Sequence, residues 1–356
     1  MNHLNTPNQS SHAAMALALF AALLFGLNAP LSKLLLPIIT PLYMVAFLYL
    51  GAGIGMLLLY VLSNKDKTEA ALSRHDLPWV VTMVVLDVIA LFLLMLGLTL
   101  TTAANAALLF NFEMVATAVI ALVFFHEAVG KRMWLSLGII TLASIFVCVD
   151  FADAATWQIS PGSLLVLAAC ACWGLENNCT RNLSAKSPME IVIVKGLGSG
   201  TTALAIALLS TTPFPQSALA IVATALLGFI AYGLSIFFYV KAQRHLGAAR
   251  TSAYYAAAPF MGVLLSLLIL KDVPSWTFAA AAAIMLCGVW LAIQENHAHH
   301  HRHQPLTHDH AHAHEDQHHL HRHNPPVTAS HSHEHTHDAC DHEHPHNPDI
   351  HHRQQH

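Results

Sequence analysis

The side chains of this sequence that could do chemistry lie inside apolar stretches. The clearest stretch, Trp173–Arg181, reads WGLENNCTR and continues the apolar run LLVLAACAC. A charged group at the centre of a bilayer costs about 2.5–3.5 kcal/mol on the mildest insertion scale, so such groups usually face a cavity and carry function. Glu176, Asn177 and Arg181 are therefore predicted to line a polar cleft between membrane-spanning helices.

Two more carboxyl groups lie within apolar runs, and Glu113 is the first candidate. It is in ALLFNFEMVATAV, two residues after Asn111 and near the middle of the predicted span 103–125, with no cation nearby in sequence. A buried carboxyl without a charged partner can bind a proton or a cation and release it. Asp87, in VVLDVIALF, has the same properties. The alternative for both is a structural hydrogen bond or ion pair with another helix.

Lys195, Asn28 and Tyr254 complete the candidate set. Lys195 lies about a turn and a half into its apolar run, where a carboxyl could neutralise it, so a structural ion pair is the alternative to a substrate contact. Tyr254 and its neighbour Tyr255 could offer rings and hydroxyls to a cavity, or anchor the helix at the membrane interface. The residues predicted to line a transport cavity are Asn28, Asp87, Asn111, Glu113, Glu176, Asn177, Arg181, Lys195 and Tyr254.

The composition predicts a polytopic membrane protein. Hydrophobic residues make up 55% of the chain and charged residues 10%, well below the roughly 25% charged residues of soluble domains. Ten apolar runs of about 19–25 residues are each long enough to cross a hydrocarbon core of about 30 Å. Residues 1–12 contain no Lys or Arg, so we expect no cleavable signal peptide. The spans are expected near residues 13–36, 41–62, 77–98, 103–125, 131–149, 163–183, 189–209, 217–240, 247–270 and 275–293.

The loops predict an orientation. With the N-terminus inside, ten Lys and Arg residues fall in or beside inner loops, and only Lys33 and Lys271 lie toward the outer face. Because basic residues favour the cytoplasmic side, we expect a bacterial-type inner (cytoplasmic) membrane protein with both termini in the cytoplasm.

The second half of the chain repeats the first. Shifted by 148 positions, Trp173–Arg181 matches Phe25–Lys33, FGLNAPLSK, so Glu176 aligns with Asn28. TAANAALLF from Thr102 matches GAARTSAYY at a shift of 145. Repeats of five helices, an odd number, must insert in opposite orientations, which places a substrate site near the midplane between them. The predicted organisation is an N-terminal cytoplasmic segment, two repeats joined by an outer linker, and a cytoplasmic tail, over residues 1–12, 13–149, 150–161, 162–293 and 294–356.

Small residues and prolines fit this arrangement. Lipid gives no hydrophobic force between helices, so Gly51, Gly53, Gly196 and Gly198 are expected at close helix contacts. Pro30 and Pro259 are expected to interrupt their helices and free carbonyl groups, or to cause ordinary kinks.

These features together resemble one family. Ten spans in two halves, the WGLENNCTR segment, the small-residue openings of the fourth and ninth spans, and the acidic residues Glu127 and Asp272 after those spans resemble the EamA-type family of the drug/metabolite transporter superfamily. The resemblance covers residues 13–293. It implies a secondary carrier, with spans 1–4 and 6–9 around a central cavity and spans 5 and 10 at the periphery. It implies no enzyme activity and no fixed set of binding residues.

The tail differs from the rest of the chain. Residues 297–356 hold 23 of the 28 histidines, in H-x-H runs interleaved with Asp and Glu. Few apolar residues are present to form a core, so disorder is expected. Imidazole suits Zn, Ni, Co and Cu, which could bind there as labile ions, although the chain requires no cofactor. The predicted metal ligands are His308, His310, His312, His314, His331, His333, His335 and His337.

Three hypotheses follow. The first is a gradient-driven exporter of a small metabolite by alternating access, since no Walker phosphate-binding motif is present to use ATP. The second is a divalent transition-metal exporter supplied by the tail. The third is a non-transporting membrane sensor of metal or pH. The predicted partners are membrane lipid, a small-molecule substrate and transition-metal ions, and no nucleic acid.

Overall fold

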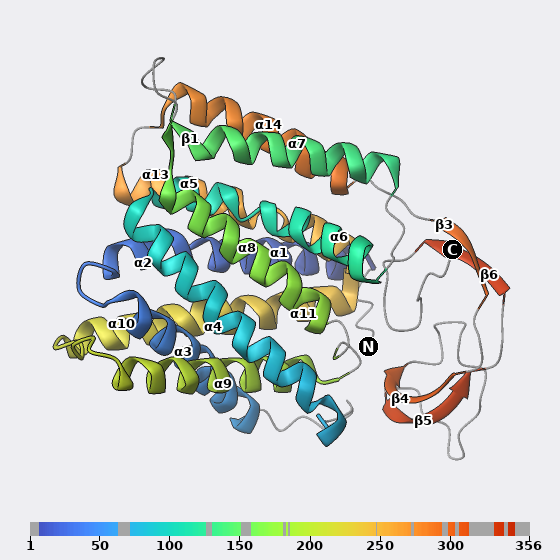
Figure 1. The fold of residues 1–356 in the computed structure, drawn as a ribbon. Coiled ribbons are helices and arrows are strands. Elements are labelled where there is room, and N and C mark those ends of the chain that lie inside the picture. The colour runs from blue at the N-terminus through green and yellow to red at the C-terminus, as the bar shows by residue number, and fades with distance from the viewer. Residues whose placement is uncertain are drawn as a thin grey trace.

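The computed structural model describes residues 7–62, 72–125, 130–150, 158–180, 183, 186–246, 248–271, 274–293, 298–302, 306–312, 331–337 and 341–345. In this part of the chain the helices form one bundle, with their axes roughly aligned and the chain running both up and down the bundle (Figure 1). The helices are α1 (Pro7–Gly26), α2 (Asn28–Leu35), α3 (Pro41–Leu62), η1 (Arg74–Asp76), α4 (Leu77–Leu100), α5 (Ala103–Leu109), α6 (Phe112–Phe125), α7 (Lys131–Cys148), α8 (Pro161–Thr180), α9 (Pro188–Leu209), α10 (Ala218–Gly228), the π-helical segment η3 (Phe229–Leu234), α11 (Ser235–Leu246), α12 (Ala248–Tyr255), α13 (Ala258–Leu270) and α14 (Trp276–Ile293).

The predicted spans correspond to these helices. In the described residues, 9 helical stretches are long and apolar enough to cross a membrane. The remaining predicted span is α8, whose 20 residues reach about 30 Å at 1.5 Å per residue. Its polar residues Glu176, Asn177 and Asn178 lower its mean hydropathy. The chain is a multi-pass membrane protein, and many apolar side chains on the outside of the bundle are exposed, as a lipid-facing surface requires.

Two spans break beside the prolines named above. Pro30 cannot donate a hydrogen bond to the carbonyl of Gly26, and α1 ends at Gly26. Pro259 likewise cannot donate to Tyr255, where α12 ends. In both spans the missing donor explains why the helix stops four residues earlier.

The fourth span also breaks, without a proline, and here the prediction of one continuous helix was wrong. Phe110 and Asn111 form a turn between α5 and α6, and the Asn111 amide donates to the Leu108 carbonyl at 3.0 Å. A side chain that bonds a local carbonyl in this way competes with the helix ladder. Glu113 therefore lies in the first turn of α6 and not in the middle of a helix. Shifted by 145 positions, this break falls within one residue of the break between α12 and α13.

The two repeats are inverted. The equivalent helices α3 and α9 pack against each other, with Gly196 against Gly53 and Gly200 against Leu50. Since the contact moves backward along α3 as it moves forward along α9, the two helices are antiparallel. A pseudo-two-fold axis in the membrane plane also relates the pairing of α4 with α8 to that of α11 with α1. The equivalent helices α7 and α14 lie together at one edge of the bundle (Figure 1), the peripheral position that the resemblance implies.

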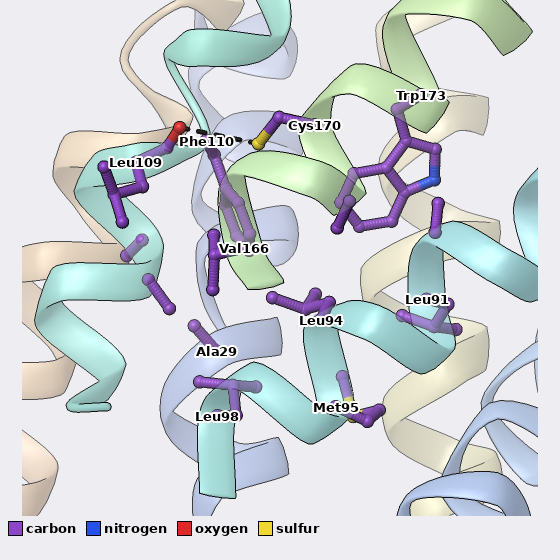
Figure 2. Close-up of a cluster of buried hydrophobic side chains, with 14 of the residues drawn as sticks. Ala29, Leu91, Leu94, Met95, Leu98, Leu109, Phe110, Val166, Cys170 and Trp173 are labelled. Atoms are coloured by element: carbon purple, nitrogen blue, oxygen red, sulfur yellow. Dashed lines mark hydrogen bonds between the residues drawn. The ribbon is translucent and has the colours of Figure 1, made fainter. Parts of the chain in front are cut away.

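Small and aromatic side chains fill the centre. A Cβ atom on Gly196 would lie 2.6 Å from the Cα of Gly53, so only glycine permits this helix crossing. Beside the crossing, Phe110 and Trp173 pack edge to face at 6.1 Å between ring centroids (Figure 2). The Cys170 thiol donates to the carbonyl of Leu109 at 3.5 Å in the same cluster.

Short strands complete the described residues. In the tail, β3 (Ala298–Arg302) pairs with β6 (Asp341–Pro345), and β4 (Leu306–His312) pairs with β5 (His331–His337), both antiparallel. An isolated two-stranded ribbon is marginally stable in water, which is in keeping with the predicted disorder of the tail. The outer linker contributes β1 (Val149–Asp150) and β2 (Gln158–Ile159), also antiparallel.

Candidate functional site

A cavity of about 670 Å³ lies at the centre of the bundle. Helices α1, α3, α6, α7, α8, α9, η3, α11, α12 and α13 contribute to its wall, together with the turns that break the fourth and ninth spans. Its polar lining consists mainly of Asn111, Glu113, Glu176, Asn177, Asn178 and Lys195.

The cavity extends toward one face of the membrane. Helices α6 and α8 run parallel, because Cys170 bonds Leu109 while Asn178 bonds the carbonyl of Thr117 further along both helices. Their C-terminal ends are therefore at the same face. Ala121, near the end of α6, lines the cavity on this side. It is also the side on which α1 begins (Figure 1).

Aromatic rings line the end of the cavity that is deepest in the bundle. Phe25 lies 6.0 Å from Phe110 and 6.0 Å from Tyr232, measured between ring centroids. Phe110 in turn packs on Trp173, and all four residues line the cavity. The four rings therefore form one contiguous layer in the wall of the cavity.

A lysine links two spans beyond the aromatic layer. The Lys33 ammonium, in the last turn of α2, donates to the carbonyl of Leu98 and, at 2.7 Å, to that of Thr101. These carbonyls are at the C-terminal end of α4, where helix geometry leaves acceptors unpaired and a cation is favourable. Lys33 therefore holds α2 against α4 on the side away from the cavity mouth.

Three charged side chains from three helices form a buried cluster. Lys195 of α9 lies 3.1 Å from the Asp87 carboxylate of α4 and 3.2 Å from the Glu176 carboxylate of α8. Asp87 and Glu176 are 0% and 2% exposed. Thr180 also donates to Glu176, at 2.5 Å. One ammonium thus neutralises one of two carboxylates, and the cluster carries a formal charge of −1 when all three groups are ionised.

Glu113 forms a separate acidic position in the same cavity. Its carboxylate accepts a hydrogen bond from the Asn177 amide at 2.7 Å, and Asn177 is also 3.4 Å from the Thr117 hydroxyl. Among the described residues Glu113 has no ion pair, since the two ion pairs of Lys195 are with Asp87 and Glu176. It is half-buried and lines the cavity, so a solute could reach it.

The repeat places a neutral pair opposite the charged cluster. Asn28 is the equivalent of Glu176, and Tyr232 is the equivalent of Asp87 at a shift of 145. The Asn28 amide donates to the Tyr232 hydroxyl at 2.7 Å, and Ser32 donates to Asn28 at 3.2 Å. Polar contacts between the two repeats are therefore present at both equivalent places, charged where α4 meets α8 and α9 and neutral where α2 meets η3.

The structure brings most of the predicted residues together. Asn111, Glu113, Glu176, Asn177 and Lys195 line the cavity, whereas Asp87 and Asn28 lie behind its wall and contact Lys195 and Tyr232, which line it. Arg181 is outside the described residues, as is His314 of the tail. The other seven predicted metal ligands lie on β4 and β5, where His308, His310 and His312 pair with His335, His333 and His331 in register.

One predicted residue, Tyr254, is not among those that line the cavity. The Tyr254 hydroxyl lies 2.9 Å from the sulfur of Met15, and the cavity is lined by the next residue, Tyr255. Adjacent residues of a helix point about 100° apart, so a shift of one residue moves a side chain off the cavity wall. Tyr49, Trp173 and Tyr232 also line the cavity and were not predicted. Aromatic residues are common throughout such helices, and sequence alone does not distinguish those that face a cavity.

Known proteins share this architecture. The EamA-like transporter family matches residues 12–149 and 160–294. An "Uncharacterized transporter" of Methanothermobacter thermautotrophicus is 26% identical over 287 residues, covering 76% of this chain and 83% of that protein. The "Uncharacterized transporter YyaM" of Bacillus subtilis is 19% identical over 246 residues, covering 66% and 79%. A crystal structure 16% identical in sequence has the same fold, with a TM-score of 0.56 over 79% of this chain and 96% of that one. The chain therefore belongs to the EamA-like transporter family, within the drug/metabolite transporter superfamily.

Proposed function

We propose that the protein is a gradient-driven exporter of a small organic solute, which it moves by alternating access, and that Glu113 exchanges a proton for the solute. The observation that carries the proposal is a half-buried carboxylate without an ion pair among the described residues, in a central cavity of about 670 Å³. Such a carboxylate can bind either a proton or a cationic group of the solute, but not both, and this competition couples two fluxes.

The shape of the cavity supports alternating access. It extends toward one face as far as Ala121. On the other side the aromatic rings pack together and Lys33 joins α2 to α4, and we take these contacts to close that side. With the N-terminus in the cytoplasm of a bacterial-type cell, the open face is the cytoplasmic one, from which an exporter loads. Inverted repeats supply the second state, because exchanging the conformations of the two halves closes this face and opens the other.

The test is solute-driven proton movement. Purified full-length protein is reconstituted in vesicles that contain a pH-sensitive dye, and a solute identified by a growth-resistance screen of amines, amino acids, drugs and metal salts is added. We expect Glu113→Gln to abolish solute-dependent proton flux while the protein stays folded and monodisperse. The matched control is Glu190→Gln, since Glu190 contacts Tyr60 and the backbone of Leu72 away from the cavity. Wild-type flux in Glu113→Gln would exclude Glu113 from the mechanism.

A second candidate function is export of a transition metal delivered by the tail. The strand pairing of β4 with β5 supports it, because three histidines of one strand are in register with three of the other, and imidazole is a good ligand for Zn, Ni, Co and Cu. Deletion of residues 297–356 separates the candidates. Loss of metal tolerance with retained solute efflux would support a metal function for the tail. No change in either property would exclude this second candidate function.

A further inference from the structure

We infer that the transported solute is an organic monocation: a protonated amine or quaternary ammonium group carried on an aromatic or aliphatic body. This inference rests on the proposed function only in taking the cavity as the transport site. The alternatives are an amino acid, an organic anion and a metal ion.

The charges in and behind the cavity wall favour a cation. The cluster of Asp87, Glu176 and Lys195 already places two carboxylates on one ammonium. Glu113 adds a third carboxylate, whose hydrogen-bond donor is the neutral amide of Asn177. A solute cation can therefore bind Glu113 directly, without breaking an ion pair.

The same arrangement disfavours a solute with a carboxylate. Among the described residues that line the cavity, Lys195 is the one with a cationic side chain. Its ammonium already lies 3.2 Å from Glu176 and 3.1 Å from Asp87. An incoming carboxylate would either take the place of one of them or add a third negative charge to one ammonium, and a buried negative charge without a cation is strongly unfavourable. An amino acid would meet this cost through its carboxylate, even though its ammonium group could bind Glu113 favourably.

Aromatic side chains supply the surface for the body of the solute. Phe25, Trp173 and Tyr255 line the cavity, and ring faces attract organic cations as well as apolar groups. Trp173 precedes Asn177 by four residues on α8, so both lie on one face of the helix. The Asn177 amide in turn holds Glu113. An anionic oxygen and an indole ring are thus close enough to serve one molecule, and the volume suits a small organic ligand.

A metal ion fits this lining less well. Hard cations such as Ca²⁺ take six to eight oxygen ligands, and transition metals favour imidazole or thiolate. In the described part of the chain, no group of three or more His, Cys, Asp and Glu side chains is arranged to hold a metal.

Binding of three probes with one skeleton tests the inference. Calorimetric titration of the full-length protein in detergent compares 2-phenylethylamine, L-phenylalanine and 3-phenylpropionate. We expect the amine to bind at least tenfold more tightly than the other two. Glu113→Gln should weaken amine binding by tenfold or more, and Trp173→Leu should also weaken it, while Glu190→Gln should leave it unchanged. The Trp173 variant keeps the test informative if Glu113→Gln does not fold.

Each contrary outcome is decisive. Binding of L-phenylalanine or 3-phenylpropionate as tightly as the amine, no binding of the amine, or amine binding that is unchanged in both cavity variants would overturn the inference. The result is separable from the proposed function. Amine binding without any solute-driven proton flux would refute the transport mechanism alone, whereas proton flux driven by 3-phenylpropionate would refute the solute class alone.

Discussion

Lys195 is the residue whose loss should most destabilise the helix bundle. Its ammonium lies 3.1 Å from Asp87 and 3.2 Å from Glu176, and thereby joins α9 to α4 and α8. In Lys195→Met the side chain keeps a similar length but loses its charge. Two carboxylates that are 0% and 2% exposed would then face each other without a cation.

The magnitude follows from what each substitution leaves behind. Removing one partner of a buried ion pair costs about 3–5 kcal/mol, so we expect Lys195→Met to lower the free energy of unfolding by that amount. Asp87→Asn should cost less, about 1–3 kcal/mol, because Lys195 keeps Glu176 as its partner and only an imperfectly paired amide remains. In the double variant one of the two opposed carboxylates is gone. Its cost should therefore fall below the sum of the single costs by about 2 kcal/mol.

Unfolding of the purified protein by SDS in mixed micelles, followed by circular dichroism, measures these free energies. Size-exclusion profiles report whether each variant is folded at the start. If Lys195→Met were as stable as the wild type, or if the two single costs were additive, the cluster would not act as a unit. Glu190→Gln serves as the control for removal of a charge outside the cluster.

Three further predictions concern closure, packing and mobility. Lys33→Met removes donors to the carbonyls of Leu98 and Thr101. Hydrogen bonds to a charged group contribute about 1.5–3 kcal/mol, so their loss should favour opening of the cavity on the Lys33 side. In a protein without native cysteines, a thiol reagent added from that side should label Phe25→Cys at least tenfold faster when Lys33→Met is also present. An unchanged labelling rate would argue against a closing role for Lys33. Gly196→Ala places a Cβ atom 2.6 Å from the Cα of Gly53 and should lower the free energy of unfolding by about 1–3 kcal/mol. The control is Gly138→Ala, whose Cβ atom would have no neighbouring atom within 4 Å, and which should be neutral or slightly stabilising. Equal effects of the two substitutions would contradict the packing argument. Amide hydrogen exchange should be faster in α2 and η3 than in α8 and α9, and the reverse order would show that the helices of the charged cluster are the more mobile ones.

The fold could be predicted from the sequence because its determinants are local or repetitive. The length of each apolar run sets the number of spans, and each run can be read without its neighbours. The shift of 148 positions that aligns Phe25–Lys33 with Trp173–Arg181 indicated a repeat, and the odd number of spans in each repeat required the two to be inverted. The antiparallel packing of α3 and α9 confirms this.

The contacts within the site could not be predicted in the same way. Asp87, Glu176 and Lys195 come from three helices, and sequence indicates that each is costly in lipid but not which one is its partner. The broken fourth span was also missed, since no proline marks it and the competing bond is made by the side chain of Asn111. Predicting Tyr254 in place of Tyr255 reflects the same limit, because a rotation of one residue about a helix axis depends on tertiary packing.

Two equivalent contacts between the repeats are unequal, and we expect this inequality to matter for transport. Ion pairs join α4 of the first repeat to α8 and α9 of the second through Lys195, and all three are unbroken helices. The equivalent contact, between α2 and η3, is one hydrogen bond between Asn28 and Tyr232, and the backbone there is irregular: α1 and α2 are separate, and η3 is π-helical. Irregular helices of this kind are frequent at functional sites, where the backbone must rearrange. We therefore expect the two repeats to move relative to each other more easily at the neutral contact than at the charged cluster.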